Sequence, residues 1–195
     1  MSDPPRGFRH RVVVVRHGAT AWSGEGRHTG KTDVPLTEEG RGEALRLRSL
    51  LPRWTFAAVY TSPLQRARDT CELAGYGEVA VSDPDLVEWD YGKYDGLTTA
   101  EIRATRPGWD LWRDGVPDGE TLEEVTARAD AVLSRAGTAD GDVLLFGHGH
   151  ILRVLTARWL EQPAELGRRF RLDPAAPGVL HHEHEWPTLN GWNLG

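Results

Sequence analysis

The sequence predicts an α/β fold, a three-layer α/β/α sandwich in which helices cover both faces of a largely parallel central sheet. Three observations predict it. Short apolar segments typical of strands alternate along the chain with longer segments typical of helices. Residues 12–15 are a continuous β-branched run, which is typical of a strand buried on both faces. The chain has 195 residues without a repeat or a low-complexity linker, so we expect a single domain over residues 1–195.

The first half of the chain supplies three strands and two helices of this pattern. After the strand at 12–15, Thr37 is a helix N-cap candidate, and the helix runs to about Leu51 because Pro52 follows. Residues 56–61 predict the second strand. A helix then begins at Pro63, since proline is favoured at the first helical position, and continues through about residue 74.

The third strand and an irregular region follow. Residues 79–81 predict a short strand, and residues 83–96 predict a loop because of their proline and glycines. A short helix is expected near 98–105, and residues 106–120 predict another loop.

The second half begins with a strong helix signal. Thr121 and Glu124 form a capping box, and one helical face behind them is apolar. Residues 142–146 predict a strand, residues 150–161 a helix that ends before Pro163, and residues 178–185 a final strand. The apolar face is formed by Leu122, Val125, Ala129, Val132 and Leu133.

Composition excludes several classes of protein. With 23 Lys+Arg against 29 Asp+Glu, the formal net charge is −6, so we expect no nucleic-acid or membrane partner. The single cysteine, Cys71, excludes an internal disulfide and a multi-cysteine metal site, and we expect it to be buried in a helix. Residues 1–10 lack the apolar stretch of a secretory signal, and we expect a cytoplasmic protein.

Polar side chains follow the predicted strands at the points where each strand ends. In open α/β sheets ligands bind beyond the carboxyl ends of the strands, so these groups are expected to converge although they are far apart in sequence. They are Arg16 and His17 after the first strand, Arg66 after the second, Glu88 after the third and His148 after the fourth.

The same segments carry a family resemblance. The stretches VVVVRHGATAW, TDVPLTEEG, TSPLQRARDT, LVEWDYGKYDG, PDGETLEEV and LLFGHGHILR occur in the order found in the histidine phosphatase superfamily, the family of cofactor-dependent phosphoglycerate mutase. The chain resembles that family over most of residues 11–193, which implies a phosphoglycerate mutase-like fold. The sequence of these stretches is most similar to that of small acid phosphatases and sedoheptulose-bisphosphatase-like members.

The resemblance implies a role for each converging residue. His17 corresponds to the nucleophile that becomes phosphohistidine, and Glu88 to the acidic proton donor. The guanidinium groups of Arg16 and Arg66 disfavour a charged imidazole and, with His148, are expected to donate to the phosphoryl oxygens. A carboxyl beside a phosphate dianion is expected to stay protonated, because like charges repel.

Further positions match segments that touch phosphate or substrate in relatives, and no cofactor or metal is implied. Two histidines of the segment 181–184 would share a strand face, which is too few ligands for a closed metal site. The expected substrate-binding residues are Gly18, Ser23, Arg27, Thr29, Gly30, Tyr91, Gly149 and His150.

The sequence therefore predicts a phosphatase that hydrolyses a small phosphorylated metabolite, with sugar phosphates as one candidate class. The alternative is a phosphoglycerate mutase. It is disfavoured because only residues 97–118 separate the acidic loop from the later glycine motif, and because the segment after Trp192 is short. An inactive binding or scaffold protein is less favoured, since all five catalytic positions are filled. Neither the physiological substrate nor the choice between monomer and homodimer can be read from the sequence.

Overall fold

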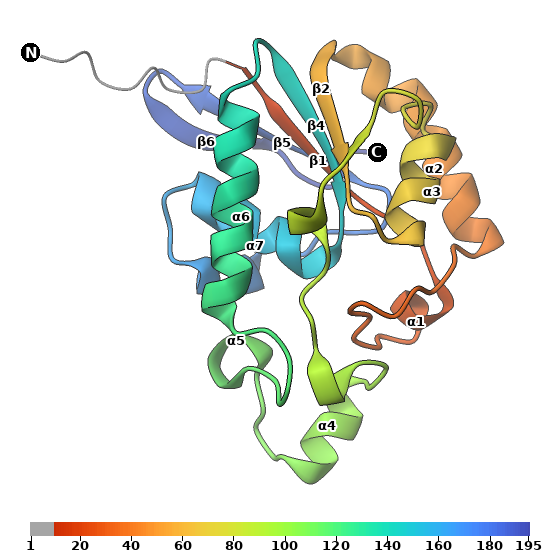
Figure 1. Ribbon diagram of the computed structural model, residues 1–195, viewed down its shortest axis with the longest axis vertical. Coiled ribbons are helices and arrows are strands. Elements are labelled where there is room, and N and C mark those ends of the chain that lie inside the picture. The colour runs from red at the N-terminus through yellow and green to blue at the C-terminus, as the bar shows by residue number, and fades with distance from the viewer. Residues whose placement is uncertain (1–9) are drawn as a thin grey trace, which may run out of the picture.

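The computed structural model describes residues 10–195, and its centre is a six-stranded sheet (Figure 1). The strands are β1 (Val12–Arg16), β2 (Phe56–Thr61), β3 (Val81–Ser82), β4 (Asp142–Gly147), β5 (Pro177–Glu183) and β6 (Trp186–Gly191). Their order in the sheet is β3-β2-β4-β1-β5-β6. The first four strands in this order are parallel, and β5 and β6 are antiparallel to their neighbours.

Helices pack on both faces of the sheet. The α-helices are α1 (Ala21–Gly24), α2 (Glu38–Leu50), α3 (Gln65–Leu73), α4 (Thr99–Thr105), α5 (Leu111–Asp114), α6 (Leu122–Gly137) and α7 (Gly149–Trp159). Short 3₁₀ turns occupy Leu51–Arg53, Pro84–Leu86, Gly92–Tyr94 and Ala164–Arg169.

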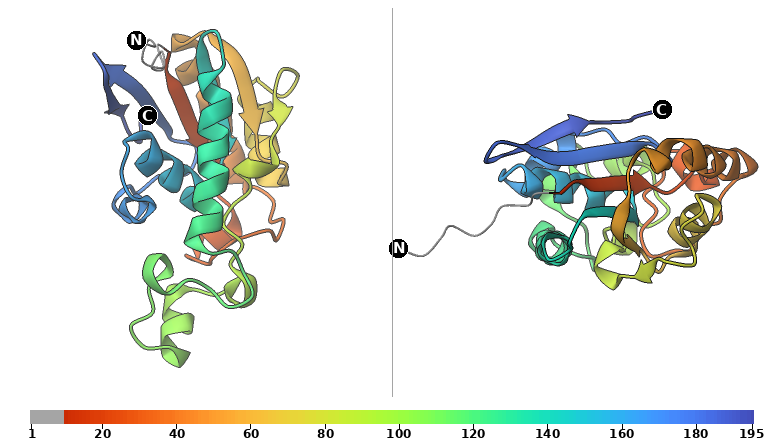
Figure 2. Two further views of the ribbon diagram at one scale, coloured as in Figure 1. Left: turned by 60° about the vertical axis from the view of Figure 1, so that its left-hand side comes forward. Right: turned by 90° about the horizontal axis from the view of Figure 1, so that it is seen from above.

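The two faces of β1 separate the core into two clusters. Val13 and Val15 pack with Leu47 of α2 and Cys71 of α3, whereas Val12 and Val14 belong to the cluster that includes α6 and α7. Figure 2 shows from two further sides that helices cover both faces of the sheet. Because successive strand side chains point to opposite faces, a strand buried on both sides must be apolar throughout. The predicted α/β/α sandwich is therefore confirmed.

The predicted helix starts are largely confirmed by their caps. The Thr37 side chain accepts a hydrogen bond from the Gly40 amide, and Thr121 forms a reciprocal capping box with Glu124. Such caps satisfy amide groups that have no partner in the first turn of a helix. One start was wrong: α3 begins at Gln65 with Leu64 as its N-cap, so Pro63 precedes the helix.

Several short elements differ from the prediction. The strand predicted at residues 79–81 was wrong in its bounds. The observed strand is β3 at 81–82, which lies at the edge of the sheet and pairs with β2. The single strand predicted over 178–185 is instead a hairpin. Strands β5 and β6 pair around a turn in which His184 has φ 56°. Helices α1 and α5 have four residues each, which is too short to give a periodic pattern.

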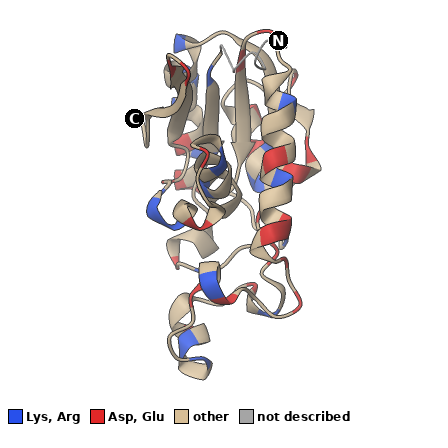
Figure 3. Cartoon of the chain, turned by 90° about the vertical axis from the view of Figure 1, so that its left-hand side faces the viewer, with Lys and Arg blue, Asp and Glu red and all other residues tan. Residues whose placement is uncertain are grey.

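The carboxyl ends of β1 and β4 point toward the end of the molecule that carries α1 and α4 (Figure 1). The segment from α4 to α5 projects beyond the sheet at this end, as Figure 2 shows. Acidic and basic residues alternate along α6 in Figure 3, as expected for a helix with one solvent-facing side. No helix among residues 10–195 is long and apolar enough to cross a membrane.

Candidate active site

His17 lies directly after β1 and is buried, with 4% of its surface exposed. Its Nδ1 is 2.7 Å from the carbonyl oxygen of Gly18. A carbonyl only accepts, so Nδ1 carries the proton and Nε2 keeps its lone pair. Burial, and then the charges of Arg16 and Arg66, lower the pKa of His17 to about 3. The ring is therefore uncharged at neutral pH, and Nε2 is free of a proton.

Gly18 positions this histidine without lining the cavity beside it. Its amide donates to Thr70 Oγ1 at 3.0 Å. A Cβ at Gly18 would lie 2.3 Å from the carbonyl oxygen of Gly40, so the chain after β1 approaches α2 too closely for any side chain. The absence of a side chain therefore holds the loop that carries His17 against α2.

Arg16 and Gly149 define a small space beside the nucleophile. Arg16 Nη1 donates to the carbonyl of Leu172 at 2.8 Å, while its buried Nε has no partner among residues 10–195. A Cβ built on Gly149 would lie 3.7 Å from Arg16 Nε and 3.7 Å from Glu88 Oε2. The unused donor and the carboxylate thus flank one position, which glycine leaves open.

Glu88 is held at the N-terminus of α7. Its carboxylate accepts backbone hydrogen bonds from His150 at 3.0 Å and from Ile151 at 3.0 Å. Burial alone would raise the pKa of Glu88, but His150 and these amide groups stabilise the charged form, and the net pKa lies well below the usual range. Without a phosphate nearby, Glu88 is a carboxylate. The protonated form expected from the sequence therefore depends on the arrival of a dianion.

Arg66 and His148 lie behind the nucleophile. Both side chains are fully buried, and the rings of His17 and His148 have centroids 5.2 Å apart. The two Nη nitrogens of Arg66 donate to the carbonyls of Thr29 at 3.1 Å, Gly30 at 2.7 Å and Thr32 at 2.9 Å. Neither Arg66 nor His148 lines the adjacent cavity. Their direct contact with phosphoryl oxygens stays a prediction, whereas their position next to His17 is plain.

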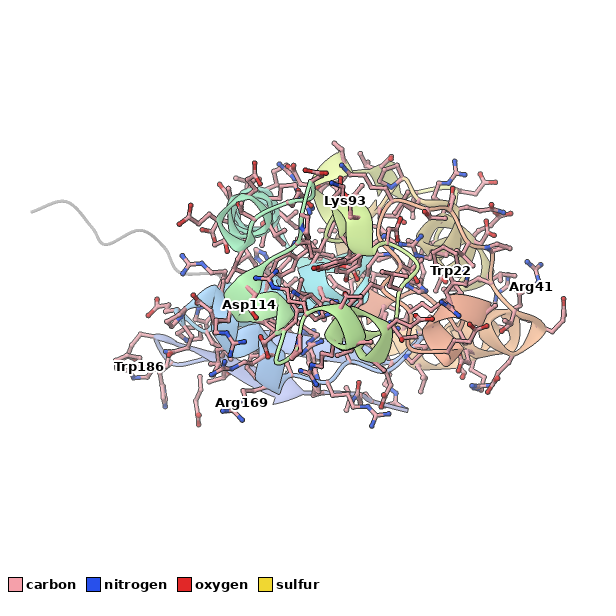
Figure 4. The ribbon with its side chains drawn as sticks, turned by 90° about the horizontal axis from the view of Figure 1, so that it is seen from below. Trp22, Arg41, Lys93, Asp114, Arg169 and Trp186 are labelled. Atoms are coloured by element: carbon pink, nitrogen blue, oxygen red, sulfur yellow. The ribbon has the colours of Figure 1, made fainter. Side chains whose placement is uncertain are left out.

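A cavity of about 450 Å³ opens in front of His17. Figure 4 views the molecule from the end that carries α1 and α4, with Trp22 of α1 and Lys93 labelled. Of the residues singled out from the sequence, nine line the cavity and four do not: Gly18, Gly30, Arg66 and His148 lie outside its wall. The nine are Arg16, His17, Ser23, Arg27, Thr29, Glu88, Tyr91, Gly149 and His150.

Two of the nine use their polar side-chain atoms in hydrogen bonds or ion pairs within the protein. Ser23 Oγ accepts from the Thr20 amide at 2.9 Å and completes the cap of α1. Arg27 pairs with Glu25 at 2.6 Å and donates to the carbonyl of Gly96 at 2.8 Å. Gly30, outside the wall, donates its amide to Asp95.

Sequence reasoning missed several lining residues. His28 has a pKa lowered to about 4, chiefly by burial, and Arg153 lies one helical turn after His150. Arg153 ends the stretch LLFGHGHILR, and His28 lies four residues before TDVPLTEEG, so their proximity to these stretches was the available signal. Residues 171–174 also line the cavity. They precede β5 and carry no motif, so only the fold brings them to the site.

The histidine segment near the C-terminus lies away from this cavity. The ring of His182 packs on that of Trp159, with centroids 4.9 Å apart, and His184 lies in the β5–β6 turn. Over the described range 10–195, no three His, Cys, Asp or Glu residues are grouped so that they could hold a metal ion.

Comparison with known proteins decides the family. The model of the histidine phosphatase superfamily (branch 1) matches residues 12–195. This chain belongs to the histidine phosphatase superfamily. The resemblance read from the sequence is thereby confirmed.

Two curated relatives are similar over most of the chain. An acid phosphatase of Mycobacterium tuberculosis is 42% identical over 179 residues, which cover 90% of this chain and 88% of that protein. A sedoheptulose 1,7-bisphosphatase of Saccharomyces cerevisiae is 35% identical over 182 residues, 76% of this chain and 67% of that protein. A solved structure of a Mycobacterium tuberculosis open reading frame product superposes with a TM-score of 0.88 at 40% identity, and covers 95% of this chain and 97% of that one.

Proposed function

We propose that this protein is a phosphoric monoester hydrolase that acts on a small phosphorylated metabolite through a phosphohistidine at His17. The observation that carries the proposal is the orientation of His17, whose Nδ1 is committed to Gly18 so that Nε2 is the available nucleophile. The unpartnered Nε of Arg16 and the carboxylate of Glu88 lie on two sides of the position that Gly149 leaves open. The named phosphatases among its relatives support the same reaction class.

In the first step, His17 Nε2 attacks phosphorus and the phosphorus–oxygen bond of the ester breaks. Glu88 takes up a proton from the solvent as the incoming phosphate dianion raises its pKa, and it then gives that proton to the leaving alkoxide. The lost ester bond is replaced by a nitrogen–phosphorus bond. Arg16 Nε donates to the transferring oxygens, whose charge is the main thing to stabilise.

In the second step, water attacks the phosphohistidine. Glu88, now a carboxylate, accepts one proton of that water, the nitrogen–phosphorus bond breaks, and His17 returns to its neutral form with release of phosphate. Two steps of moderate difficulty thus replace one difficult transfer. All groups used are side chains of this chain, and the mechanism requires no metal.

The test is to trap the intermediate. The purified protein is incubated with a ³²P-labelled phosphomonoester in excess EDTA, quenched in alkali, which preserves phosphohistidine, and analysed by peptide mapping. We expect label on His17, none in His17→Ala, and full labelling in His184→Ala, a histidine in the exposed β5–β6 turn. Turnover by His17→Ala, or turnover that disappears with EDTA, would contradict the proposal.

A second arm separates hydrolysis from phosphoryl return. Phosphate release is compared with interconversion of 2- and 3-phosphoglycerate in the same preparation. Release should dominate, because water can reach a cavity that opens in front of His17. Interconversion faster than release would identify a mutase, and tight ester binding without either reaction would identify a binding protein. A panel of sugar phosphates and bisphosphates then defines the substrate.

A further inference from the structure

The loop that carries Glu88 is held from outside the cavity by a pair of charged side chains at α6. Glu120 directly precedes Thr121, the N-cap of α6, and Arg128 lies on the helix itself. Arg128 Nε and Nη2 donate to the two carboxylate oxygens of Glu120, each at 2.8 Å. The two side chains are only 18% and 19% exposed, so the pair is mostly withdrawn from water. Neither residue lines the cavity, and the reaction proposed above uses neither.

Both members of the pair also bind the main chain of this loop. Arg128 Nη1 donates to the carbonyl of Asp85 at 2.7 Å and to that of Val87 at 2.8 Å. On the other side of the proton donor, the amide of Asp90 donates to Glu120 Oε2 at 2.9 Å. The backbone is thus fixed immediately before the proton donor and again shortly after it.

The main chain that leads into α6 adds further contacts to the loop. The Glu120 amide donates to the carbonyl of Asp90 at 3.0 Å, and Trp89 Nε1 donates to the carbonyl of Glu120 at 2.8 Å. A Cβ on Gly119 would lie 2.3 Å from the Asp90 carbonyl oxygen, so the two segments touch backbone to backbone. These contacts replace the ladder of hydrogen bonds that a strand or a helix would supply to an irregular loop.

The side chain of Glu88 is held less firmly when it carries a proton. As a carboxylate it accepts from the amide groups of His150 and Ile151 at the start of α7. Hydrogen bonds to an ionised acceptor are about twice as strong as those between neutral groups. Once the carboxyl takes up the proton that the reaction needs, one oxygen becomes a hydroxyl and the bonds to α7 weaken. The position of the acid then depends on the backbone that carries it.

We propose that Arg128 is a positioning residue, which holds the backbone at Val87 and orients Glu120 so that the protonated form of Glu88 stays beside the leaving oxygen. The inference rests on the proposed phosphatase function and adds a residue outside the cavity to it. The planar fork of arginine suits this role, because it pairs with a carboxylate while its remaining nitrogen binds carbonyl oxygens. The compact ammonium of a lysine cannot do both at once.

Arg135 offers a matched control on the same helix. It lies two turns after Arg128 and forms ion pairs with Asp83 and with Asp85, both at 2.7 Å. These contacts bind α6 to side chains at the start of the same loop, whereas Arg128 binds the main chain next to Glu88. Loss of Arg135 should therefore loosen the fold and leave the backbone at the proton donor in place.

The test compares two esters in Arg128→Met. The nitrophenolate of p-nitrophenyl phosphate leaves without a proton, whereas the alkoxide of n-propyl phosphate needs one. The measured quantity is kcat/KM, which reports the attack of His17 and not the later attack of water. We expect kcat/KM for n-propyl phosphate to fall about 10–10²-fold, as for a reacting group held out of place, and that for p-nitrophenyl phosphate to change by less than about 3-fold. Arg135→Met should leave the ratio of the two values unchanged.

A second arm asks whether Arg128 acts through Glu88. Added to Glu88→Gln, the Arg128→Met change should lower kcat/KM for n-propyl phosphate no further, because the proton donor that it positions is already lost. A loss in the double variant equal to the product of the two single losses would show that Arg128 acts independently of Glu88, and it would overturn the proposal.

Arg128→Lys keeps the test decisive if the methionine variant does not fold. It retains the positive charge beside Glu120 but not the fork, so we expect the same ester-selective loss at a urea midpoint closer to that of the wild type. An equal loss on both esters, or no loss on either, in the variant that folds would overturn the positioning role and leave the phosphatase function standing. Turnover of neither ester by the wild type would overturn both.

Discussion

Arg66 Nε donates to Nδ1 of His148 at 3.1 Å, a hydrogen bond between buried residues that are 82 positions apart. Because the guanidinium can only donate, it fixes the proton of a neutral His148 on Nε2, which in turn donates to Ser62 Oγ at 2.8 Å. Burial, followed by the charge of Arg66, keeps the pKa of His148 well below its usual value. Arg66 and His148, both predicted phosphate ligands, thus hold each other in position. As a result, the uncharged ring of His148 lies beside His17.

Glu88→Gln should lower kcat by about 10²–10⁴-fold, the usual cost of a lost general acid. The glutamine keeps the shape of the side chain but carries no transferable proton. Steady-state rates with alkyl phosphates measure the effect, and Glu123→Gln on the exposed face of α6 is the matched control. An unchanged rate with these poor leaving groups would assign the proton donor to another residue.

The same carboxylate should make stability depend on pH. The folded pKa of Glu88 is depressed, so its charge stabilises the fold above the unfolded value and this contribution is lost as pH falls below it. We therefore expect the free energy of unfolding to decrease more steeply below about pH 4.3 in the wild type than in Glu88→Gln. Urea unfolding at closely spaced pH values measures the two slopes, and equal slopes would mean that Glu88 is not ionised in the native state.

His17 should make the free energy of unfolding depend on pH in a second, higher range. Its folded pKa of about 3 lies below the unfolded value of about 6.5, so the unfolded chain binds more protons between these limits and stability rises with pH there. The contribution amounts to about 1.4 kcal/mol for each pH unit of the window. His17→Asn, which can still donate to the Gly18 carbonyl, should flatten the urea-unfolding profile between pH 6 and 4. An identical profile would place the proton on this ring in the folded protein.

Gly149→Ala should fold normally and lose activity. The added methyl group makes ordinary contacts at 3.7 Å, and alanine is favoured in a helix, but the methyl occupies the position between Arg16 and Glu88. We expect kcat/KM to fall by about 10²-fold, as for a reacting group held out of place. Gly42→Ala in α2, where a Cβ meets nothing within 4 Å, is the control. A fully active Gly149→Ala would show that phosphate binds elsewhere.

Ser23→Ala should affect stability more than turnover. Its hydroxyl completes the capping box of α1 with Thr20, so its loss should cost about 1 kcal/mol of unfolding free energy. A direct contact of the hydroxyl with substrate would instead raise KM without changing the urea midpoint. Ser49→Ala on the exposed side of α2 provides the reference for a serine outside the site.

The sequence predicted most of the sheet because β1 and β4 are apolar on both faces, a pattern that only a central strand requires. It failed at β3, where two exposed residues pair with β2 at the sheet edge and no burial pattern exists. The β5–β6 turn was missed because its residues His184 and Glu185 are not typical turn formers. In these places tertiary contacts decide the structure.

For the site, motifs located the groups that do chemistry but not the hydrogen bonds that orient them. The convergence of His17 and Glu88 follows from the strand ends, and the structure places both at one cavity. The commitment of Arg66 to loop carbonyls and the contacts of Arg128 beside Glu88 depend on distances between segments that no sequence pattern encodes. Residues 171–174 reach the cavity only because β5 returns beside β1.

Cys71, packed between α3 and the sheet, has a consequence for how the protein meets oxidants and electrophiles. Burial raises the pKa of this thiol to about 12, so the reactive thiolate is scarcely populated, and the chain has no second cysteine to react instead. Iodoacetamide or hydrogen peroxide at doses that inactivate thiolate-dependent phosphatases should leave the phosphatase activity proposed for His17 unchanged. The activity of this chain should therefore be insensitive to the redox poise of its surroundings, because its one thiol is both buried and protonated.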